Sequence, residues 1–268
     1  MAPTTGIVRG VASGVSVLLA DNPGPMTLDG TNSYLLAGSA DGLVVVDPGP
    51  DDEVHLRALA AEGDVQLVLI THRHADHTAG AAHFAAMTGA PVRAKDPAHC
   101  HGGAPLADGE LLDLGGLQIR VVPTPGHTSD SVCFHLVDAA GGGGPGTVLT
   151  GDTVLGRGTT VIAHPDGELG AYLESLRTLA GLGPALVLPA HGPELPDLAA
   201  VCAAYLDHRL QRLDSVRAAQ LVLGPAATVT AVTDLVYAEV DPSVRAAAEL
   251  SVAAQLEFLG RSGGWPER

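Results

Sequence analysis

Lysine is nearly absent from this sequence of 268 residues and occurs only at Lys95. Lysine and arginine together number 14 against 30 acidic residues, so the formal net charge is −16 at neutral pH. An acidic surface of this kind repels polyanions electrostatically. The composition therefore disfavours broad, non-specific binding to nucleic acid or to an anionic membrane, although it leaves room for a local basic patch.

Cysteine is scarce as well, with three residues at Cys100, Cys133 and Cys202. Three thiols cannot form a disulfide framework, and none has zinc-finger spacing. We expect small buried side chains in a reducing compartment. No apolar run reaches the roughly 18–20 residues of a membrane helix. We interpret the apolar segment Gly10–Ala20 as a strand, not as a signal peptide, because it is short and lacks a basic start. We therefore expect a cytoplasmic protein without a membrane partner.

Hydrophobic residues make up 46% of the chain, which is enough for a sizeable core. The length fits one large domain, or one large domain with a smaller second one. Short apolar runs bounded by glycine, proline or aspartate alternate with helical patterns up to Leu188. The predicted strands are Val15–Leu19, Ser33–Leu36, Leu43–Val46, Val65–Ile70, Gln118–Val122, Val132–Leu136, Thr147–Leu149 and Ala185–Leu188. The predicted helices are Asp52–Ala61, Thr78–Thr88 and Glu168–Leu182.

The pattern becomes helical after His191, which predicts a domain boundary between residues 195 and 196. One long helix is expected from Pro196 to about Leu223, a second from a Thr230 cap to about Val240, and a third from Asp241–Pro242 to Leu259, ended by Gly260. A short β-wing over Arg261–Trp265 would complete the small domain of residues 196–268.

The segment from His72 to His77 carries three histidines and an aspartate directly after an apolar strand. Alternation along the strand end directs His72 and His74 to the same side. A turn into the next helix then brings Asp76 and His77 towards a neighbouring point. Imidazole and carboxylate groups bind zinc, and also iron or manganese. The segment predicts part of a site for two metal ions.

Four ligands do not complete two metal sites, so further ligands are expected at the ends of later strands. His127 follows the strand that ends at Val122, in the sequence Thr-Pro-Gly-His-Thr. Asp152 and His191 likewise follow predicted strands and lie beside glycine. Each of these residues alone would more often be structural, but their co-occurrence with the His72–His77 segment favours a metal centre.

These seven positions resemble the ligand pattern of the metallo-β-lactamase superfamily, H-x-H-x-D-H followed by H, D and H. The resemblance implies an α/β (α+β) fold, a four-layered αββα sandwich with the ligands on one rim. It implies that the first metal is bound by His72, His74 and His127, and the second by Asp76, His77 and His191. Asp152 would bridge both metals, and Asp47 would support the metal loop.

A narrower resemblance covers nearly the whole chain. Thr31-Asn32-Ser33-Tyr34, the segment Gly151–Thr160 and the pair His208-Arg209 look like the branch that contains lactamase-like protein 2. That branch includes endoribonucleases and carries a winged-helix-like C-terminal domain. It is close to glyoxalase II-type thioesterases and to lactamase-type thioesterases of polyketide pathways.

The chemistry implied is hydrolysis by a metal-bridging hydroxide that attacks an ester, thioester or phosphodiester. Asp76 would bind metal and orient that hydroxide, and Asp152 would be the other catalytic carboxylate. No Gly-x-Ser-x-Gly nucleophile elbow is found in the sequence. Beta-lactams are disfavoured as substrates, because the true lactamases usually replace the aspartate at position 152.

Candidate substrate-binding residues follow from the same resemblance. We expect Arg157 to receive an anionic group. We expect His208 and Arg209 to form an anion site that faces away from the apolar stripe of their helix, which comprises Leu198, Cys202, Leu206, Leu210, Leu213 and Val216. The full candidate set is Asn32, Arg157, Thr159, Thr160, His164, His208 and Arg209.

Two specific activities remain open. Cleavage of short single-stranded RNA is favoured by the branch, whereas a small acyl thioester fits the acidic surface better. Zinc is the expected metal, with manganese or iron as alternatives, and the C-terminal region could form a homodimer contact. Two hypotheses assign the chain to other functional classes: an iron-dependent oxidoreductase, and a nucleic-acid-binding regulator with a vestigial metal site.

Overall fold

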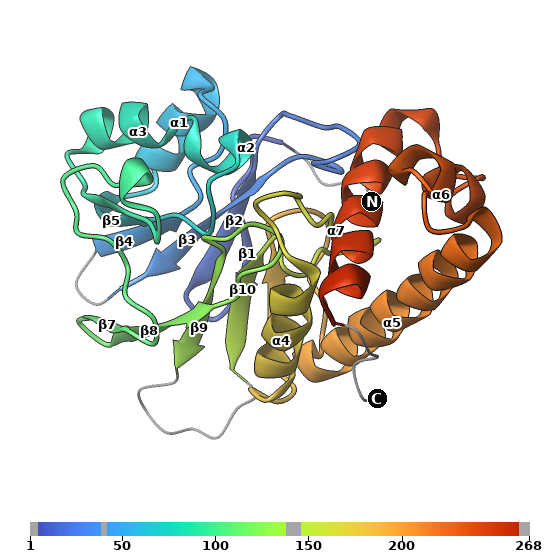
Figure 1. The fold of residues 1–268 in the computed structure, drawn as a ribbon. Coiled ribbons are helices and arrows are strands. Elements are labelled where there is room, and N and C mark those ends of the chain that lie inside the picture. Colours follow the sequence, from blue (N-terminus) through green and yellow to red (C-terminus); the bar gives the residue numbers. More distant parts are fainter. Residues whose placement is uncertain (1–4, 39–41, 138–145, 263–268) are drawn as a thin grey trace.

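The computed structural model describes residues 5–38, 42–137 and 146–262. Two β-sheets lie face to face, and helices cover the outer face of each (Figure 1). The first sheet has the order β1 (Arg9–Ala12), β2 (Val15–Leu19), β3 (Asn32–Ala37), β4 (Gly42–Val46), β5 (Asp64–Leu69) and β6 (Val92–Arg93). The second has the order β11 (Leu186–Pro189), β10 (Thr147–Gly151), β9 (Val132–Val137), β8 (Leu117–Pro123) and β7 (Leu111–Leu114).

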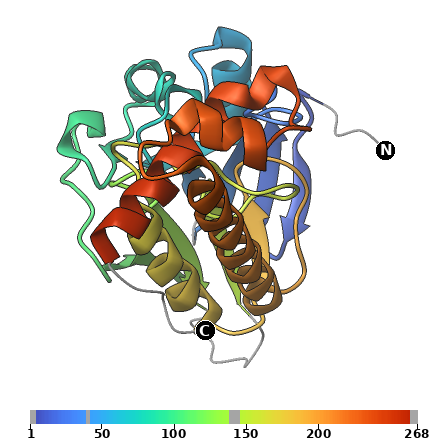
Figure 2. The ribbon, with the colours of Figure 1, turned by 45° about the vertical axis from the view of Figure 1, so that its right-hand side comes forward.

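The helices form two groups. The first accompanies the first sheet and comprises α1 (Glu53–Ala60), α2 (Ala75–Thr78), α3 (Ala81–Thr88) and the 3-10 turn η1 (Pro97–His99). The second lies beside the other sheet and comprises α4 (Leu169–Ala180), α5 (Leu198–Leu223), α6 (Val229–Val236), η2 (Pro242–Val244) and α7 (Arg245–Ser262). In the rotated view, α4, α5 and α7 lie side by side, and residues of all three are in contact (Figure 2).

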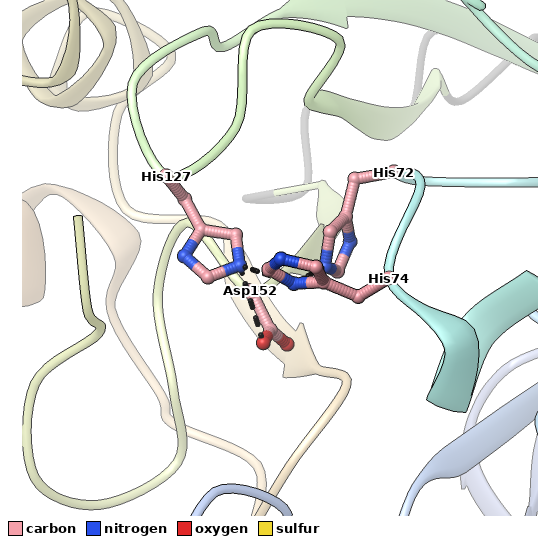
Figure 3. Close-up of side chains that lie close together, drawn as sticks. All are labelled: His72, His74, His127 and Asp152. Carbon is pink, nitrogen blue, oxygen red and sulfur yellow. Dashed lines mark hydrogen bonds and ion pairs between the residues drawn. The ribbon is translucent and has the colours of Figure 1, made fainter. Parts of the chain in front are cut away.

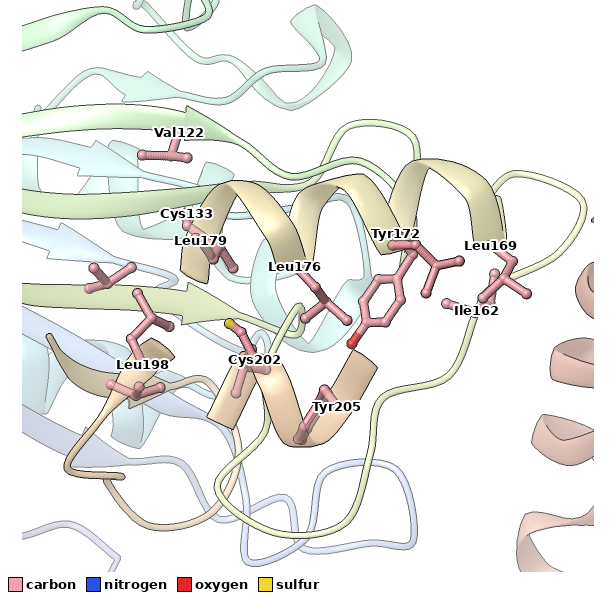
Figure 4. Packing of buried hydrophobic residues seen from close by; sticks show 14 of the residues in the cluster. Val122, Cys133, Ile162, Leu169, Tyr172, Leu176, Leu179, Leu198, Cys202 and Tyr205 are labelled. Atoms are coloured by element: carbon pink, nitrogen blue, oxygen red, sulfur yellow. The ribbon is translucent and has the colours of Figure 1, made fainter. Parts of the chain in front are cut away.

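Alternation along the strands creates three apolar layers. In β4, Val44 and Val46 face the second sheet, whereas Val45 faces α1 and α3. In β8, Val121 faces the first sheet and Val122 faces α4 and α5 (Figure 4). Helix, sheet, sheet and helix therefore stack in that order, and the predicted four-layered αββα sandwich is confirmed.

The direction of the strands brings the loops that carry the predicted metal ligands to one rim of the sandwich. Strands β4 and β5 are parallel, as are β10 and β11. Strand β8 runs in the same direction as β10 because both are antiparallel to β9. The loops that follow β8, β10 and β11 therefore share one edge of the second sheet, and the loops after β4 and β5 share one edge of the first.

The eight predicted strands are present: Val15–Leu19 has the predicted bounds, and the bounds of the other seven differ by one or two residues. Gly10–Ala20 is not a single strand: its residues form the end of β1 and all of β2, an antiparallel hairpin with a turn at Gly14. Strands β6 and β7 were not predicted. The helix predicted over Thr78–Thr88 corresponds to α3. A separate short helix, α2, precedes it, because the chain turns at Ala79–Gly80.

The three C-terminal helices are confirmed, with corrections to their bounds. α6 ends at Val236 and not near Val240, and the 3-10 turn η2 precedes α7. Thr228, and not Thr230, caps α6, because its side chain accepts a hydrogen bond from the Ala231 N–H. Gly260 does not end α7, which continues to Ser262. Residues 263–268, which include most of the expected wing, lie outside the described residues.

The predicted boundary at residue 195 falls inside a shared hydrophobic core. Leu198, Cys202 and Tyr205 of α5 belong to the same buried cluster as α4 and strands of the second sheet (Figure 4). A further cluster, centred on Val216 and Val252, joins the distal part of α5 to α6 and α7. None of the helices in the described part of the chain is both long enough and apolar enough to cross a lipid bilayer.

Candidate metal centre

The loop after β5 is fixed by a buried carboxylate from the neighbouring strand. Asp47, directly after β4, is 1% exposed and accepts hydrogen bonds from the Thr71 backbone N–H (2.8 Å) and hydroxyl (2.6 Å). Its backbone has a φ of 52°, an unusual value for a residue with a side chain. These bonds hold the start of the His72–His77 segment in one conformation.

Four predicted ligands form a first cluster (Figure 3). Nδ1 of His74 lies 3.0 Å from Nε2 of His72 and 3.0 Å from Nε2 of His127. Oδ2 of Asp152 lies 3.6 Å from Nε2 of His127. One ligand atom from each residue lies within 4.8 Å of the others, so all four side chains point at a common position.

The other three predicted ligands form a second cluster. Oδ2 of Asp76 lies 3.1 Å from Nε2 of His191 and 3.3 Å from Nε2 of His77. Oδ1 of Asp152 lies 3.3 Å from the same atom of His191 and 3.6 Å from that of His77. Asp152 therefore directs one carboxylate oxygen towards each cluster. The structure thus brings together all seven residues that the sequence predicted.

The outer nitrogens of the histidines have partners that fix the ring orientation. Nδ1 of His127 donates to the Val161 carbonyl at 2.6 Å, and Nδ1 of His191 to the Gly30 carbonyl at 3.0 Å. Nδ1 of His77 lies 2.8 Å from Oδ2 of Asp47. A proton on each Nδ1 leaves the Nε2 lone pair directed into the cluster, which is the arrangement of metal-binding imidazoles.

Several inward atoms fit a bound cation. Nε2 of His77, Nε2 of His191 and Oδ1 of Asp152 are buried and have no hydrogen-bond partner among the described residues. Buried polar atoms of this kind cost free energy unless something satisfies them. Two nitrogens bound to one tetrahedral zinc at about 2.0–2.1 Å would lie about 3.3 Å apart, close to the spacing observed. Both clusters are therefore suited to divalent metal ions.

The two clusters differ in how they titrate without metal. Burial and neighbouring imidazoles lower the pKa of His72, and burial lowers the pKa of His127 to about 4. Burial also opposes protonation of His77 and His191, but nearby carboxylates outweigh it and raise the pKa of both. For Asp76, burial would raise the pKa, but the imidazoles around it lower it well below its usual range. The first cluster therefore offers neutral imidazoles, and the second pairs protonated imidazoles with a carboxylate.

A cavity of about 270 Å³ opens beside the first cluster, with His127 and Asp152 on its lining. Five of the predicted substrate-binding residues line it: Arg157, Thr159, Thr160, His208 and Arg209. Thr160 also contacts the metal cluster, because its Oγ1 lies 3.1 Å from Nδ1 of His127. The loop after β10 and helix α5 therefore meet at this cavity.

Two other candidates are placed away from the cavity. Asn32 is 8% exposed, and its side-chain amide donates to the carbonyls of Pro189 (2.9 Å) and Gly192 (3.0 Å). It holds the loop that carries His191 and does not line the cavity. Nε2 of His164 lies 2.8 Å from a carboxylate oxygen of Glu257, so this imidazole joins the loop after β10 to α7.

The two arginines also differ from expectation. Arg157 lines the cavity, but its guanidinium forms a two-pronged ion pair with Asp29, so its charge is already balanced. Arg209 does not face away from the apolar stripe. It is 3% exposed and lies on the buried face of α5 with Tyr205 and Leu213. The stripe expected through Leu206 and Leu210 is therefore rotated, and both of these leucines are only half-buried.

Sequence reasoning missed one wall of the cavity. It is lined by Tyr237, Val240, Val244, Ala247, Ala248 and Ser251, which follow α6 or belong to η2 and α7. Within this set, Val244, Ala247, Ala248 and Ser251 stand at positions i, i+3, i+4 and i+7, a helical face that is visible in the sequence. Nothing in the sequence showed that this face lies opposite the metal cluster, because that depends on how α7 packs against α4 and α5.

Two facing mixed sheets with two His/Asp clusters on one rim define a metal-dependent protein of the αββα class. The family model of the metallo-beta-lactamase superfamily matches residues 26–191. The chain belongs to this superfamily, as its ligand pattern predicted.

Curated relatives and solved structures agree with this assignment. An atrochrysone carboxyl ACP thioesterase from Aspergillus chevalieri is 36% identical over 76% of this chain; the match spans 65% of that protein, just under two thirds of its length. A beta-lactamase domain protein from Burkholderia ambifaria shares the fold over 98% of this chain and 90% of its own, with a TM-score of 0.80 and 24% identity. TTHA1623, solved in a di-iron-bound form, is 28% identical and superposes with a TM-score of 0.54 over 68% of this chain and 96% of its own.

Proposed function

We propose that this chain is a dinuclear metal-dependent hydrolase that cleaves acyl thioesters. The observation that carries the proposal is the position of Asp152, which directs one oxygen to each of two adjacent clusters. We assign His72, His74 and His127 to one metal and Asp76, His77 and His191 to the other, with Asp152 between them. Zinc suits these nitrogen and oxygen donors, as would iron or manganese.

Two bound cations would lower the pKa of a shared water and stabilise the oxyanion that forms when the thioester carbonyl is attacked. The protein's own part is to hold the donors in place. Asp47 fixes the Nδ1 proton of His77, and the carbonyls of Val161 and Gly30 do the same for His127 and His191. Asp76, whose side chain is 26% exposed, stays a carboxylate and is placed to orient the attacking water.

An acyl substrate is favoured over RNA by the surroundings of the site. The cavity beside the first cluster has an apolar wall that includes Leu28, Leu155 and Val244. Arg157 is paired with Asp29, and the chain has a net charge of −16, so few cations are free to bind a phosphate backbone. The similarity to a carboxyl ACP thioesterase supports the same choice.

The test is a parallel assay of purified protein whose metal content has been measured. Acyl thioesters of increasing chain length and a short single-stranded RNA would be offered to the wild type and to His74→Ala. We expect thioester turnover that the variant loses, and about two metal ions per wild-type chain. Turnover of RNA alone would replace this proposal with the ribonuclease function. Stoichiometric iron in protein purified without added metal, together with no hydrolysis, would favour an oxidoreductase.

A further inference from the structure

Arg209 is a buried cation beside the cavity and has no anionic partner among the described residues. It is 3% exposed and lines the cavity together with His127 and Asp152. No ion pair among the described residues includes it, and its Nε has no hydrogen-bond partner there. A guanidinium stays charged in proteins, and a buried charge is costly unless an opposite charge balances it.

Within the described part of the chain, the contacts that hold the Arg209 guanidinium are with neutral groups. One of its terminal nitrogens donates to the Thr160 carbonyl oxygen. The guanidinium carbon lies 5.2 Å from the centre of the Tyr172 ring, which projects from α4 towards α5 (Figure 4). A carbonyl and a ring face hold the guanidinium in position without cancelling its charge. The group is therefore preorganised on the cavity lining.

The neighbouring groups favour an anion with one concentrated charge. His208 also lines the cavity, and burial together with Arg209 and Arg212 lowers its pKa, so it offers a neutral imidazole next to the guanidinium. Arg157 is balanced by Asp29, and the guanidinium of Arg212 lies over the Tyr237 ring at 4.7 Å. The Arg209 guanidinium is thus the group whose charge is not balanced by a described residue. Its N–H donors match a carboxylate, which accepts two parallel hydrogen bonds.

The opposite wall is apolar. Val240 of the segment after α6, Val244 of η2, and Ala247 and Ala248 of α7 line the cavity. On α7, one turn beyond the cavity-lining Ser251, Gln255 is 1% exposed, and neither atom of its amide has a partner among the described residues. The occupant that fits is an apolar chain with a polar, charged end.

We propose that Arg209 binds a carboxylate on the acyl part of the substrate, so that the preferred substrates are thioesters of dicarboxylic acids with an apolar spacer. One carbonyl would lie at the metal centre and the distal carboxylate at Arg209. This inference rests on the proposed thioesterase function and deepens it. Thr160 connects the two ends, because its carbonyl accepts from Arg209 and its hydroxyl contacts His127.

The test uses matched pairs of N-acetylcysteamine thioesters with acyl groups of four to seven carbons. In each pair, one acyl group ends in a carboxylate and the other in a carboxamide of the same length. At the best length, we expect wild-type kcat/KM to be at least about tenfold higher for the acid. No preference for the acid at any length would overturn the proposal, whatever the variants do.

Arg209→Met should reduce the preference to within about twofold, through a higher KM for the acid, and Arg209→Lys should keep part of it. Arg177→Met, a change at an exposed ion pair on α4, is the control and should leave the preference unchanged. If Arg209→Met lowers turnover of acid and amide equally, the residue only supports Thr160 and the proposal is wrong. Should Arg209→Met not fold, the wild-type comparison and Arg209→Lys decide the matter.

A binding measurement separates this inference from the proposed function. Calorimetry with the metal-loaded wild type should show tighter binding of a dicarboxylate than of its monoamide, and Arg209→Lys should weaken this difference. If no thioester is hydrolysed but this difference is found, the thioesterase function is wrong and the carboxylate site stands. Equal binding of both compounds would remove the site.

Discussion

Oδ2 of Asp47 lies 2.8 Å from Nδ1 of His77, and the two residues are 1% and 0% exposed. An amide at position 47 could donate to Nδ1 of His77, which would move the imidazole proton to Nε2 and block its lone pair. We expect Asp47→Asn to weaken binding of one metal ion by roughly 10–100-fold. Competition with a chromophoric chelator measures this. Asp51→Asn is the matched control, since Asp51 forms a similar but exposed pair with His83; equal effects of the two substitutions would contradict the assignment.

Replacement of Asp152 should affect both metal ions at once. Asp152→Asn removes the charge that faces the two clusters, so we expect fewer than two metal ions per chain and a loss of hydrolysis of at least about 100-fold. Metal analysis and steady-state kinetics on the same preparation measure this. Asp113→Asn, at an exposed position on β7, should change neither quantity. A fully active Asp152→Asn protein with two metal ions would rule out the bridging role.

Removal of metal should destabilise the fold. Without a cation, Nε2 of His77, Nε2 of His191 and Oδ1 of Asp152 stay buried with no hydrogen bond from the described residues, and only ion-pair contacts of 3.1–3.6 Å among these atoms and Asp76 offset their burial. A ligand present at 100 times its dissociation constant stabilises the folded state by about 2.7 kcal/mol per site. We therefore expect chelation to lower Tm by roughly 5 °C or more, and added zinc to restore it. Scanning calorimetry that finds the same Tm with and without chelator would argue against metal binding at this position.

His55 should make stability depend on pH, independently of the metal site. This side chain on α1 is 6% exposed, its Nε2 lies 2.9 Å from Oγ of Ser33, and burial lowers its pKa to about 4, with a small opposing effect of Asp52. Between pH 6.5 and 4 the unfolded chain binds a proton that the folded chain excludes, so stability falls as pH falls through this window.

The contribution of His55 is at most about 3 kcal/mol. We expect His55→Gln to unfold with a flatter dependence on pH between 4 and 6.5 than the wild type. Urea denaturation at a series of pH values, on metal-free samples of both proteins, isolates this difference. Parallel curves would mean that the pKa of His55 is the same in the folded and the unfolded protein.

The C-terminal helices should be required for folding. Leu198, Cys202 and Tyr205 complete the core over the second sheet, and the Tyr205 hydroxyl contacts Leu155 and Gly158 in the loop after β10. A chain that ends at residue 195 would expose this core. We expect it to bind a hydrophobic dye and to lack a cooperative thermal transition. Cooperative unfolding of residues 1–195 would instead support the boundary that the sequence predicted.

The strand pattern and the metal ligands could be predicted because both depend on local sequence. Alternating or continuous apolar runs between turn residues fixed the eight strands, and each ligand directly follows one of them. The His72–His77 segment carries four ligands within six residues, so little depended on long-range packing. Strands β6 and β7 were missed because their local sequence carries little strand signal. β6 is two residues long, and three of the four residues of β7 are leucine, so its alternation of exposed and buried positions is not visible in the sequence.

The cavity could not be predicted because its walls come from distant parts of the chain. Arg209 was expected to face away from the apolar stripe of its helix, since a charged residue is rarely buried without a counter-charge. Its burial depends on the ring of Tyr172 and the carbonyl of Thr160, which reach it only after α4 and α5 pack together. The cap of α6 was misplaced by two residues because Thr228 and Thr230 carry the same signal, and only tertiary structure selects between them.

Gly151 ends β10 with a φ of 51°, and a Cβ atom built on it would lie 2.8 Å from Cβ of Thr71. The loop after β5, which carries four ligands, therefore contacts the end of β10, which precedes Asp152, at a residue that has no side chain. A methyl group at position 151 would clash with Thr71 and push the two sheets apart where the ligands converge. Tolerance to substitution at Gly151 should consequently be lower than at Asp152 as far as folding is concerned, although it is the aspartate that carries the chemistry.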